Sequence, residues 1–400
     1  MNDTKRNRLL YLLPRYDADS PEHFFHLYDF LKKLQARIPL EIVVERTSGA
    51  LPADVPMRPL RIRFPILRFG EEFFVFLAAR LRGVRDFYVH YSYTGAIAAS
   101  VVVRLCGGRA FYWNCSLYRE FPLPKDAAWG ERLRQAVNLW LLETSVRWCT
   151  YLVTGTPRVA EYYVNHARIP AQKIRLLPNF VNLERFQNVS RLEARKTLNL
   201  NPDQKVALFL HRVVPRKGAH YLPDIARFVV HEVGPVTFLI AGGGPYLQEL
   251  RRRVEQQGLA AAFDFRGWVP NRDAPLYYRA ADLYLMPSEE EGFPRVLLEA
   301  MAAGCPFVAF DIGGVRDIIA PGQETCVVPS RNVTAFADAC VKAFRTPGLL
   351  DAWRATGSEQ VRLFPQERIL EAFLRMMNGV PMGWDFFSRE AGTETPDLVG

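Results

Sequence analysis

The residues with the clearest capacity for chemistry lie in the segment PSEEEGFPRVLLEAMAAG, which starts at Pro287. Two carboxylates, Glu291 and Glu299, stand eight positions apart in it. The pattern predicts a strand, a turn and a helix beginning at about Pro294, because proline is tolerated as a first helical residue. The start of a helix suits a diphosphate, and a carboxylate that accepts two hydroxyl hydrogen bonds suits a sugar or a ribose.

The position of Glu299 favours a functional role for it. An isolated glutamate on a helix usually faces solvent. This one lies within the apolar run LLEAMAAG, where a buried charge is costly unless it has a partner.

Two further motifs precede this segment. The octapeptide HRVVPRKG carries Arg212, Arg216 and Lys217, and taken alone it is typical of a solvated basic loop. The turn Gly242-Gly243-Gly244-Pro245 lacks the spaced third glycine of the dinucleotide fingerprint, which argues against a nicotinamide dehydrogenase.

These motifs form an ordered set over roughly residues 150 to 330: PNFVNLERF, HRVVPRKG, FLIAGGGP, FRGWVP, EGFPRVLLEAMAAGCPFVA and DIGGVRDII. In this order they resemble the retaining glycosyltransferases of family 4, glycosyl transferases group 1, with their Glu-x7-Glu signature. The resemblance implies an α/β chain of the GT-B fold. Two Rossmann-like doubly wound domains would face each other across a cleft.

The resemblance also implies roles for individual residues. Arg212 and Lys217 would bind the donor diphosphate, with Arg216 as a competitor for the second role, and two fixed cations could stabilise the departing group in place of a metal. Glu291 would contact the transferred sugar and Glu299 the ribose hydroxyls. The other expected donor-binding residues are Gly243 and Gly244 for close approach, Val269 for backbone contact with the base, and Gly292 and Phe293 in the signature turn.

The first half departs from the family pattern. The loop Pro14–Pro21 lacks the family's Gly-Gly pair, and the family's active-site histidine has no clear match, with Asn114 or Cys115 near its expected place. His90 is the best remaining candidate for a catalytic histidine. A lone histidine at a strand end is more often structural.

No metal or cofactor is expected beyond the nucleotide-sugar substrate. Asp17-Ala18-Asp19 is an Asp-x-Asp triplet of the kind that can bind a divalent ion, but it falls only a few residues after the first expected strand and is interpreted as a loop. The six cysteines include no Cys-x-x-Cys pair, which indicates a reduced, cytoplasmic protein.

Short apolar runs alternate with amphipathic stretches, the pattern of parallel sheets covered by helices. We expect an acceptor-binding domain at 1–180, a donor-binding domain at 181–365, and a returning helix with a tail at 366–400. The expected strands are Leu9–Leu13, Ile42–Val44, Phe87–Val89, Phe111–Trp113, Leu152–Thr154, Val206–Leu210, Val236–Ala241, Phe263–Phe265, Leu283–Met286, Phe307–Phe310 and Cys326–Val328. The expected helices include Tyr246–Gln257, Pro294–Ala303, Asn332–Phe344 and Glu367–Met377.

The net charge of +9 is unevenly distributed. Residues 1–180 carry 26 Lys and Arg against 16 Asp and Glu, whereas residues 181–400 carry 25 against 26. Within the basic half, Met57–Arg85 and Trp129–Trp148 interleave arginine with large apolar residues. Such stretches either lie on an anionic membrane surface or pack on their own sheet. A peripheral position on the inner face of the cell membrane is expected, with no nucleic-acid partner.

The sequence therefore predicts a metal-independent, retaining glycosyltransferase of hexosyltransferase type. It would move a sugar from a nucleoside-diphosphate sugar to a hydroxyl of a glycan or lipid-linked glycan, as in assembly of cell-surface polysaccharide. Two alternatives stay open: a phosphorylase or epimerase on the same fold, and a non-catalytic donor-binding or scaffold protein.

Overall fold

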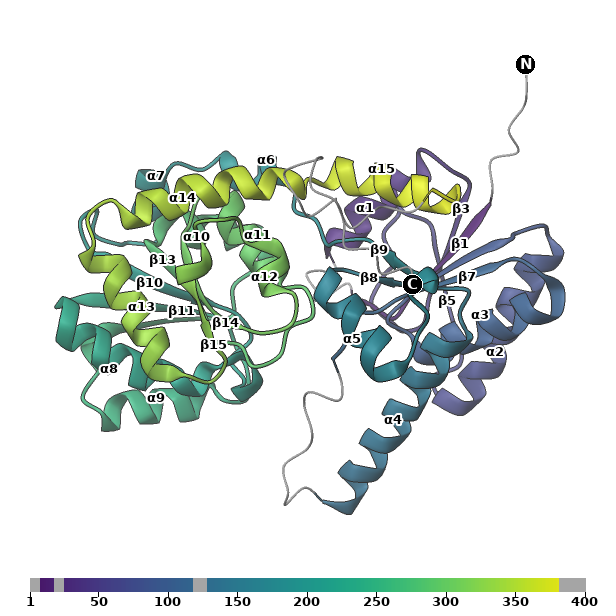
Figure 1. The fold of residues 1–400 in the computed structure, drawn as a ribbon, viewed down its shortest axis with the longest axis horizontal. Helices are drawn as coiled ribbons and strands as arrows, with labels where there is room; N and C mark the ends of the chain where they lie inside the picture. The colour runs from purple at the N-terminus through teal and green to yellow at the C-terminus, as the bar shows by residue number, and fades with distance from the viewer. Residues whose placement is uncertain (1–7, 18–24, 118–127, 381–400) are drawn as a thin grey trace. The chain divides into compact units, whose positions relative to one another are not determined.

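The computed structural model describes residues 8–17, 25–117 and 128–380, which form two compact units (Figure 1). Unit 1 contains the described parts of Met1–Pro178 and Leu370–Gly400, and unit 2 is Asn179–Ile369. Each unit has its own parallel sheet with helices packed on it.

The sheet of unit 1 has seven strands in the order β5-β3-β1-β6-β7-β8-β9, and all neighbouring strands are parallel. Its third strand, β1, reads LLYLL and is buried throughout, as expected when helices cover both faces of a parallel sheet. The strands are β1 Leu9–Leu13, β3 Leu40–Val44, β5 Met57–Pro59, β6 Asp86–His90, β7 Arg109–Trp113, β8 Tyr151–Thr154 and β9 Ile174–Leu176; a separate short pair is formed by β2 Tyr16–Asp17 and β4 Thr47–Ser48.

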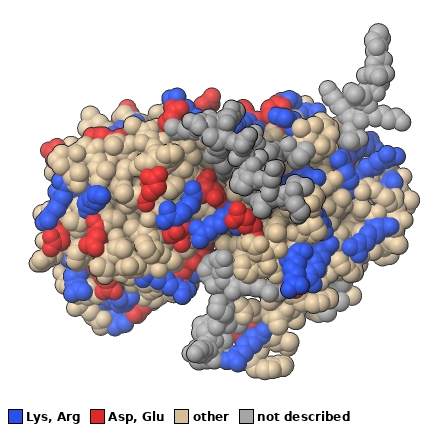
Figure 2. All heavy atoms as spheres, viewed as in Figure 1, with Lys and Arg blue, Asp and Glu red and all other residues tan. Residues whose placement is uncertain are grey.

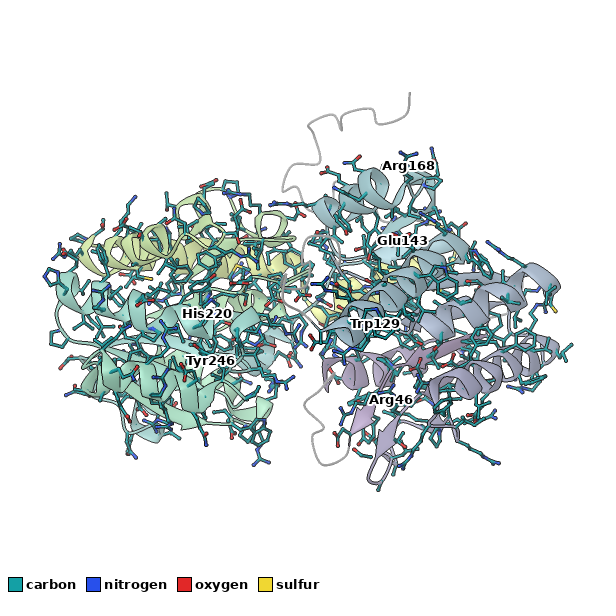
Figure 3. The ribbon with its side chains drawn as sticks, turned by 90° about the horizontal axis from the view of Figure 1, so that it is seen from below. Arg46, Trp129, Glu143, Arg168, His220 and Tyr246 are labelled. Carbon is teal, nitrogen blue, oxygen red and sulfur yellow. The ribbon has the colours of Figure 1, made fainter. Side chains whose placement is uncertain are left out.

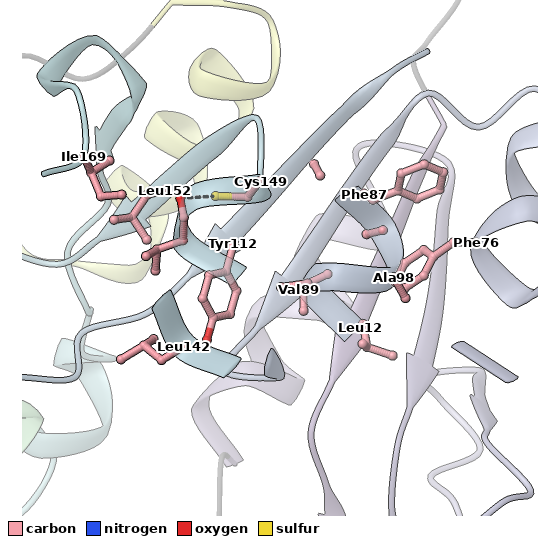
Figure 4. Packing of buried hydrophobic residues seen from close by; sticks show 14 of the residues in the cluster. Leu12, Phe76, Phe87, Val89, Ala98, Tyr112, Leu142, Cys149, Leu152 and Ile169 are labelled. Atoms are coloured by element: carbon pink, nitrogen blue, oxygen red, sulfur yellow. Dashed lines mark hydrogen bonds between the residues drawn. The ribbon is translucent and has the colours of Figure 1, made fainter. Parts of the chain in front are cut away.

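Five helices of unit 1 pack on this sheet: α1 Phe25–Gln35, α2 Pro65–Leu81, α3 Tyr93–Cys106, α4 Trp129–Trp148 and α5 Pro157–Ala167. The core between helices and sheet is shown in Figure 4, where Phe76 of α2 meets Phe87 of β6 edge to face at 5.2 Å between ring centroids. Helices α2, α3 and α4 pack side by side in chain order.

The sheet of unit 2 has six parallel strands in the order β12-β11-β10-β13-β14-β15. Its strands are β10 Lys205–Leu210, β11 Val236–Ala241, β12 Phe263–Gly267, β13 Leu283–Met286, β14 Phe307–Asp311 and β15 Val327–Pro329. The helices are α6 Leu183–Gln187, α7 Arg191–Thr197, α8 Leu222–Val233, α9 Leu247–Gln256, α10 Ala274–Ala280, α11 Arg295–Ala302, α12 Val315–Ile318, α13 Val333–Arg345, α14 Leu349–Gln360 and the first residues of α15 Gln366–Met377.

The strand orders place one topological switch point in each unit. In unit 1 the chain leaves β1 first toward β3 and later toward β6, and in unit 2 it leaves β10 first toward β11 and later toward β13. Loops after the carboxyl ends of the two strands that flank a switch point diverge and leave a crevice, where ligands of open α/β sheets bind. In unit 2 these loops are HRVVPRKG and PSEEEG.

All eleven expected strands are confirmed to within about two residues at each end. Strands β5 and β9 were not predicted, because each has only three residues and no long apolar run. The stretch Met57–Arg85, interpreted as either a membrane-surface segment or a packed helix, contains β5 and the long helix α2, which packs on α3.

Helix α15 belongs to both units, since its residues from Leu370 onward group with unit 1. Its Phe373 is buried between Tyr88 of β6, at 4.9 Å, and Phe30 of α1, at 5.6 Å. Arg109 of β7 donates a hydrogen bond to the carbonyl of Met377 at 2.6 Å and so caps the end of the helix.

None of the helices in the described ranges is long and apolar enough to span a bilayer. The six cysteines are free thiols, five of them buried. Across the same ranges, no three or more His, Cys, Asp or Glu side chains group together in a way that could hold a metal ion. Asp17 of the Asp-x-Asp triplet is paired with Arg15 at 2.5 Å and accepts a hydrogen bond from Ser48, whereas the other two residues lie outside the described ranges.

Candidate functional site

Four loops at the carboxyl edge of the unit 2 sheet are joined by backbone hydrogen bonds. Val213, after β10, donates to the carbonyl of Gly243, after β11, at 2.9 Å. Glu289, after β13, donates to Arg216 at 3.0 Å, and Gly314, after β14, donates to Gly292 at 3.0 Å. The loops that carry the sequence motifs therefore form one connected surface.

Glycines permit this close approach. A Cβ atom on Gly244 would lie 2.2 Å from the carbonyl oxygen of Val213, and one on Gly218 would lie 1.8 Å from that of Pro287. Gly218 also has φ +75°, in the left-handed region that glycine adopts without strain. Both positions require glycine for steric reasons, and Gly218 is what lets HRVVPRKG lie against the end of β13.

Three side chains meet on this surface: Glu291, Lys217 and His211. The Lys217 ammonium donates to Glu291 Oε1 at 2.6 Å, and His211 Nε2 lies 3.5 Å from the same oxygen. The backbone N–H of Arg212 donates to His211 Nδ1, so in the neutral ring the hydrogen is on Nε2 and points toward the carboxylate. Both members of the lysine–glutamate pair have side chains 12% exposed.

Burial alone would raise the pKa of Glu291. The Lys217 charge and the hydrogen bond from His211 outweigh it and lower that pKa to about 2. Burial lowers the pKa of His211, and Glu291 opposes that shift. Glu291 is therefore an ionised carboxylate at neutral pH, and burial favours the neutral form of His211.

The other predicted cations differ in their surroundings. Arg212 is exposed, and its guanidinium forms no ion pair within the described parts of the chain. Arg216 lies 3.7 Å from the exposed Glu290. Lys217 is thus the cation fixed to Glu291, while Arg212 stands beside it with its donors available to a ligand.

The loops after β11 and β12 lie against each other. Gly242 donates to the carbonyl of Gly267 at 2.6 Å, and Gly243 packs beside Trp268, whose side chain is largely exposed. Val269 follows and is half-buried. The predicted contacts Gly243, Gly244 and Val269 therefore share one side of the loop surface.

Tyr246 and His220, labelled in Figure 3, lie near each other, with ring centroids 6.5 Å apart.

The signature turn leads directly into α11. Phe293 is buried edge to face against Phe364, and Asn179 donates to its carbonyl at 3.3 Å. Pro294 has φ −75° and ψ 96°, so it precedes the helix, which begins at Arg295. The helix predicted from about Pro294 is thus confirmed and begins one residue later, because the ψ of Pro294 is extended. Glu299, in the second turn, is buried and accepts a hydrogen bond from Arg295 at 2.7 Å.

Comparison with known proteins bears on this site. Residues 190–360, which contain all of these loops, match the family model described as glycosyl transferases group 1. The site just described therefore lies within the part of the chain that matches this family, as the motif set predicted.

Two relatives match about half of the chain. A GDP-mannose-dependent alpha-(1-6)-phosphatidylinositol monomannoside mannosyltransferase of Mycobacterium tuberculosis is 32% identical over 48% of this chain and 52% of its own length. A D-inositol 3-phosphate glycosyltransferase of Streptomyces bingchenggensis is 31% identical over 50% of this chain and 46% of its own. The chain therefore spans about half the length of these relatives.

Solved structures match nearly the whole chain. Sucrose-phosphate synthase of Thermosynechococcus elongatus has a TM-score of 0.75 at 20% identity and covers 94% of this chain and 99% of its own. The Anabaena protein HepE, solved with UDP and glucose, has a TM-score of 0.72 at 16% identity over 93% and 100%. This likeness shows a shared fold and confirms the prediction of two Rossmann-like units of the GT-B class.

His90 lies outside the part of the chain that matches this family, at the end of β6 in unit 1. It is buried, stacks on Trp113 with ring centroids 4.4 Å apart, and hydrogen-bonds the Tyr11 hydroxyl at 3.1 Å. Burial lowers the pKa of His90 to about 3. It is thus a neutral, packed ring, and the structure does not bring it together with Glu291 within one unit.

Sequence reasoning missed two features. His211 was part of a quoted motif but received no role, although it directly follows a predicted strand. The second is a buried charged cluster in unit 1, consisting of Glu45 after β3 with Arg68 and Glu72 on α2. Arg68 lies 3.7 Å from Glu45 and 3.3 Å from Glu72, and Thr94 donates to Glu72 at 3.1 Å. The cluster could not be found from sequence because Glu45 is distant from Arg68 and Glu72 along the chain and meets them only in the fold.

This cluster holds two carboxylates on one guanidinium. Burial, and next the charge of Glu45, raise the pKa of Glu72 to about 8. Burial likewise raises the pKa of Glu45. The pair therefore retains a proton at neutral pH, which removes the repulsion between the two groups.

We expect Gly218→Ala to abolish nucleotide binding and to lower the free energy of unfolding by on the order of 2 kcal/mol or more, because its methyl group would overlap the Pro287 carbonyl. Gly348→Ala is the matched control, since Gly348 has the same φ of 75° but open space around it. It should cost only about 1 kcal/mol of backbone strain. Urea unfolding and calorimetric titration with nucleoside diphosphates measure both effects. Equal behaviour of the two variants would contradict the close-contact argument.

The free energy of unfolding should depend on pH through Glu72. Its folded-state pKa lies above its ordinary value, so its stabilising contribution is complete below about pH 4.5 and is lost as pH rises through about 8. Glu72→Gln cannot ionise and should flatten this decline, gaining on the order of 2 kcal/mol relative to the native chain between pH 6 and pH 8.5. The check is the urea midpoint measured across that range.

Glu41→Gln is the control for that measurement, because Glu41 lies on β3, the strand that leads to Glu45, but forms an exposed ion pair with Arg82. It should leave the pH dependence unchanged. A Glu72→Gln profile parallel to that of the native chain would show that the cluster does not titrate in this range.

Proposed function

We propose that this chain is a retaining glycosyltransferase that moves a sugar from a nucleoside-diphosphate sugar to a hydroxyl of a glycan or lipid-linked glycan. The observation that carries the proposal is the largely covered, ionised Glu291 held by Lys217 at the switch point of unit 2, in the part of the chain that matches the group 1 model. A fixed anion and fixed cations at a crevice are what a donor with a neutral sugar and an anionic diphosphate requires.

The two halves of the donor would contact different parts of this surface. The diphosphate would bind Arg212 and Lys217 and backbone N–H groups at the start of α11. As the sugar–phosphate bond breaks, negative charge grows on the departing group, and cations held in place beforehand stabilise it without reorganisation. When the diphosphate forms an ion pair with Lys217, the Glu291 carboxylate becomes available to accept hydrogen bonds from the sugar hydroxyls.

The other donor contacts follow from the same surface. Gly243 and Gly244 would allow the donor to approach the backbone, and Val269 would meet the base. Gly292 and Phe293 would support the sugar through the backbone. The Mycobacterium relative is named for GDP-mannose, whereas the Anabaena structure contains UDP, so tests of the donor should include both bases.

We expect Glu291→Gln and Lys217→Met to lower the rate of nucleoside-diphosphate release from a panel of UDP- and GDP-sugars by about 10² to 10³. Glu290→Gln is the matched control, because Glu290 is the neighbouring carboxylate but is exposed and paired only loosely with Arg216. It should retain most of the native rate. Coupled assays that detect the released diphosphate supply the measurement.

Two outcomes would reject parts of the proposal. If the native chain binds nucleotides but releases none from any sugar, it is a non-catalytic donor-binding protein. If excess chelator abolishes release and added divalent metal restores it, the chemistry depends on a metal rather than on Arg212 and Lys217 alone.

We further propose that unit 1 docks on the inner face of the cell membrane and there meets a lipid-linked acceptor. Trp129, Leu133, Val137 and Trp140 repeat along one face of α4 and are all exposed, Trp129 by 78% and Trp140 by 64%. This part of α4 extends away from the body of unit 1 (Figure 1), and Trp129 is labelled in Figure 3. On the face shown in Figure 2, basic side chains outnumber acidic ones on unit 1. Exposed aromatic residues with nearby arginines suit an anionic bilayer surface.

Co-flotation with anionic phospholipid vesicles at low salt tests this docking. The double variant Trp129→Ser/Trp140→Ser should lose about tenfold or more in vesicle binding, since two tryptophans at ~25 cal/mol per Å² contribute several kcal/mol. Trp268→Ser, which removes an exposed tryptophan of unit 2, should bind vesicles as the native chain does. Failure of the native chain to float would remove the membrane proposal and leave the donor site unaffected.

A further inference from the structure

The carboxylate of Glu299 is held on both sides. Its side chain is 6% exposed, Arg295 donates from Nη2 to Oε1 at 2.7 Å, and the Tyr278 hydroxyl donates to Oε2 at 3.4 Å. Tyr278 is itself fully buried on α10 and packs edge to face on Tyr284 of β13 at 5.2 Å. Glu299 therefore has one strong and one weak protein partner and little rotational freedom.

Arg295, the strong partner, occupies a position where a cation does not stabilise the helix. It is the first residue of α11, where the helix dipole is unfavourable for a cation. Its pairing with Glu299 at i,i+4 also has the less favourable orientation for a helix, since acid before base is the stabilising order. The Arg295 side chain is only 20% exposed, so it loses hydration as well.

The stability of helix α11 therefore does not explain why an arginine stands at position 295. The geometry of its side chain relative to Glu299 does explain it. A guanidinium is planar and remains charged when buried, so it can fix the plane of a carboxylate in a way that a flexible ammonium cannot. The arrangement keeps the Glu299 carboxylate oriented and close to the start of α11, where the proposed diphosphate binds.

We propose that Arg295 is a positioning residue that orients the Glu299 carboxylate to accept hydrogen bonds from the ribose hydroxyls of the nucleotide donor. This inference rests on the proposed function, because it assumes a nucleotide in the unit 2 site. It adds a specificity element: the Arg295–Glu299 pair makes the site prefer ribonucleotides over deoxyribonucleotides.

The test compares UDP and GDP with their 2′-deoxy counterparts by calorimetric titration, which needs no acceptor. The native chain should bind the ribonucleotide at least about tenfold more tightly, the usual value of a hydrogen bond to a charged group. In Arg295→Met this preference should shrink to about threefold or less, with little change in affinity for the deoxynucleotide. Arg295→Lys, which keeps the charge but not the planar fork, should lie between the two.

Arg191→Met is the matched control. Arg191 pairs with Asp282 at 2.5 Å at the opposite edge of the same sheet, so its loss removes a comparable ion pair away from the nucleotide. It should leave the ribose preference unchanged. Should Arg295→Met not fold, Arg295→Lys alone must still show a reduced preference.

The outcomes separate the two proposals. If the native chain binds none of these nucleotides, the proposed function fails. If it binds them but Arg295→Met retains the native preference, or weakens ribo- and deoxynucleotides equally, Arg295 has only a structural role and this inference is overturned.

Discussion

The site in unit 2 depends on the ion pair between Lys217 and Glu291. A carboxylate as buried as Glu291 would be protonated without a cation in contact, and its pKa of about 2 reflects the lysine and His211 together. The pair can form only because β10 and β13 are neighbours, which brings two loops more than 70 residues apart to one switch point. Gly218 completes the arrangement, since any side chain there would push the lysine loop away from the end of β13.

The sequence predicted the strands well for a physical reason. Strands covered on both faces by helices must be apolar throughout, so Val236–Ala241 and Leu283–Met286 stand out from the amphipathic helices around them. The loops at the carboxyl edge of the unit 2 sheet were also predictable, because their residues are contiguous in short motifs. The same reasoning could not find β9, which has three residues, or the function of His211, which depends on a carboxylate 80 positions away.

Unit 1 shows the other limit of sequence reasoning. Its net positive charge indicated an anionic partner, yet the carboxyl end of β3, beside the switch-point strand β1, carries the acidic Glu45, and Glu72 of α2 contacts the same arginine, Arg68. Charge counted along the chain describes the outer surface, whereas a crevice is lined by a few residues from different elements. The basic surface and any acceptor crevice in unit 1 are therefore separate features. A lipid-linked acceptor would need both, because the basic surface would contact the membrane that carries the lipid and the crevice would bind the hydroxyl groups.

The two units also balance buried charge differently. In unit 2 each buried carboxylate of the site has its own cation, Lys217 for Glu291 and Arg295 for Glu299. In unit 1 two carboxylates share Arg68, so a proton takes the place of the missing cation. Neutralisation by a fixed side chain does not change with pH, whereas neutralisation by a proton does. Under the proposed function, any loss of activity at alkaline pH should therefore arise in unit 1, whereas the ion pairs of the unit 2 site keep their charge.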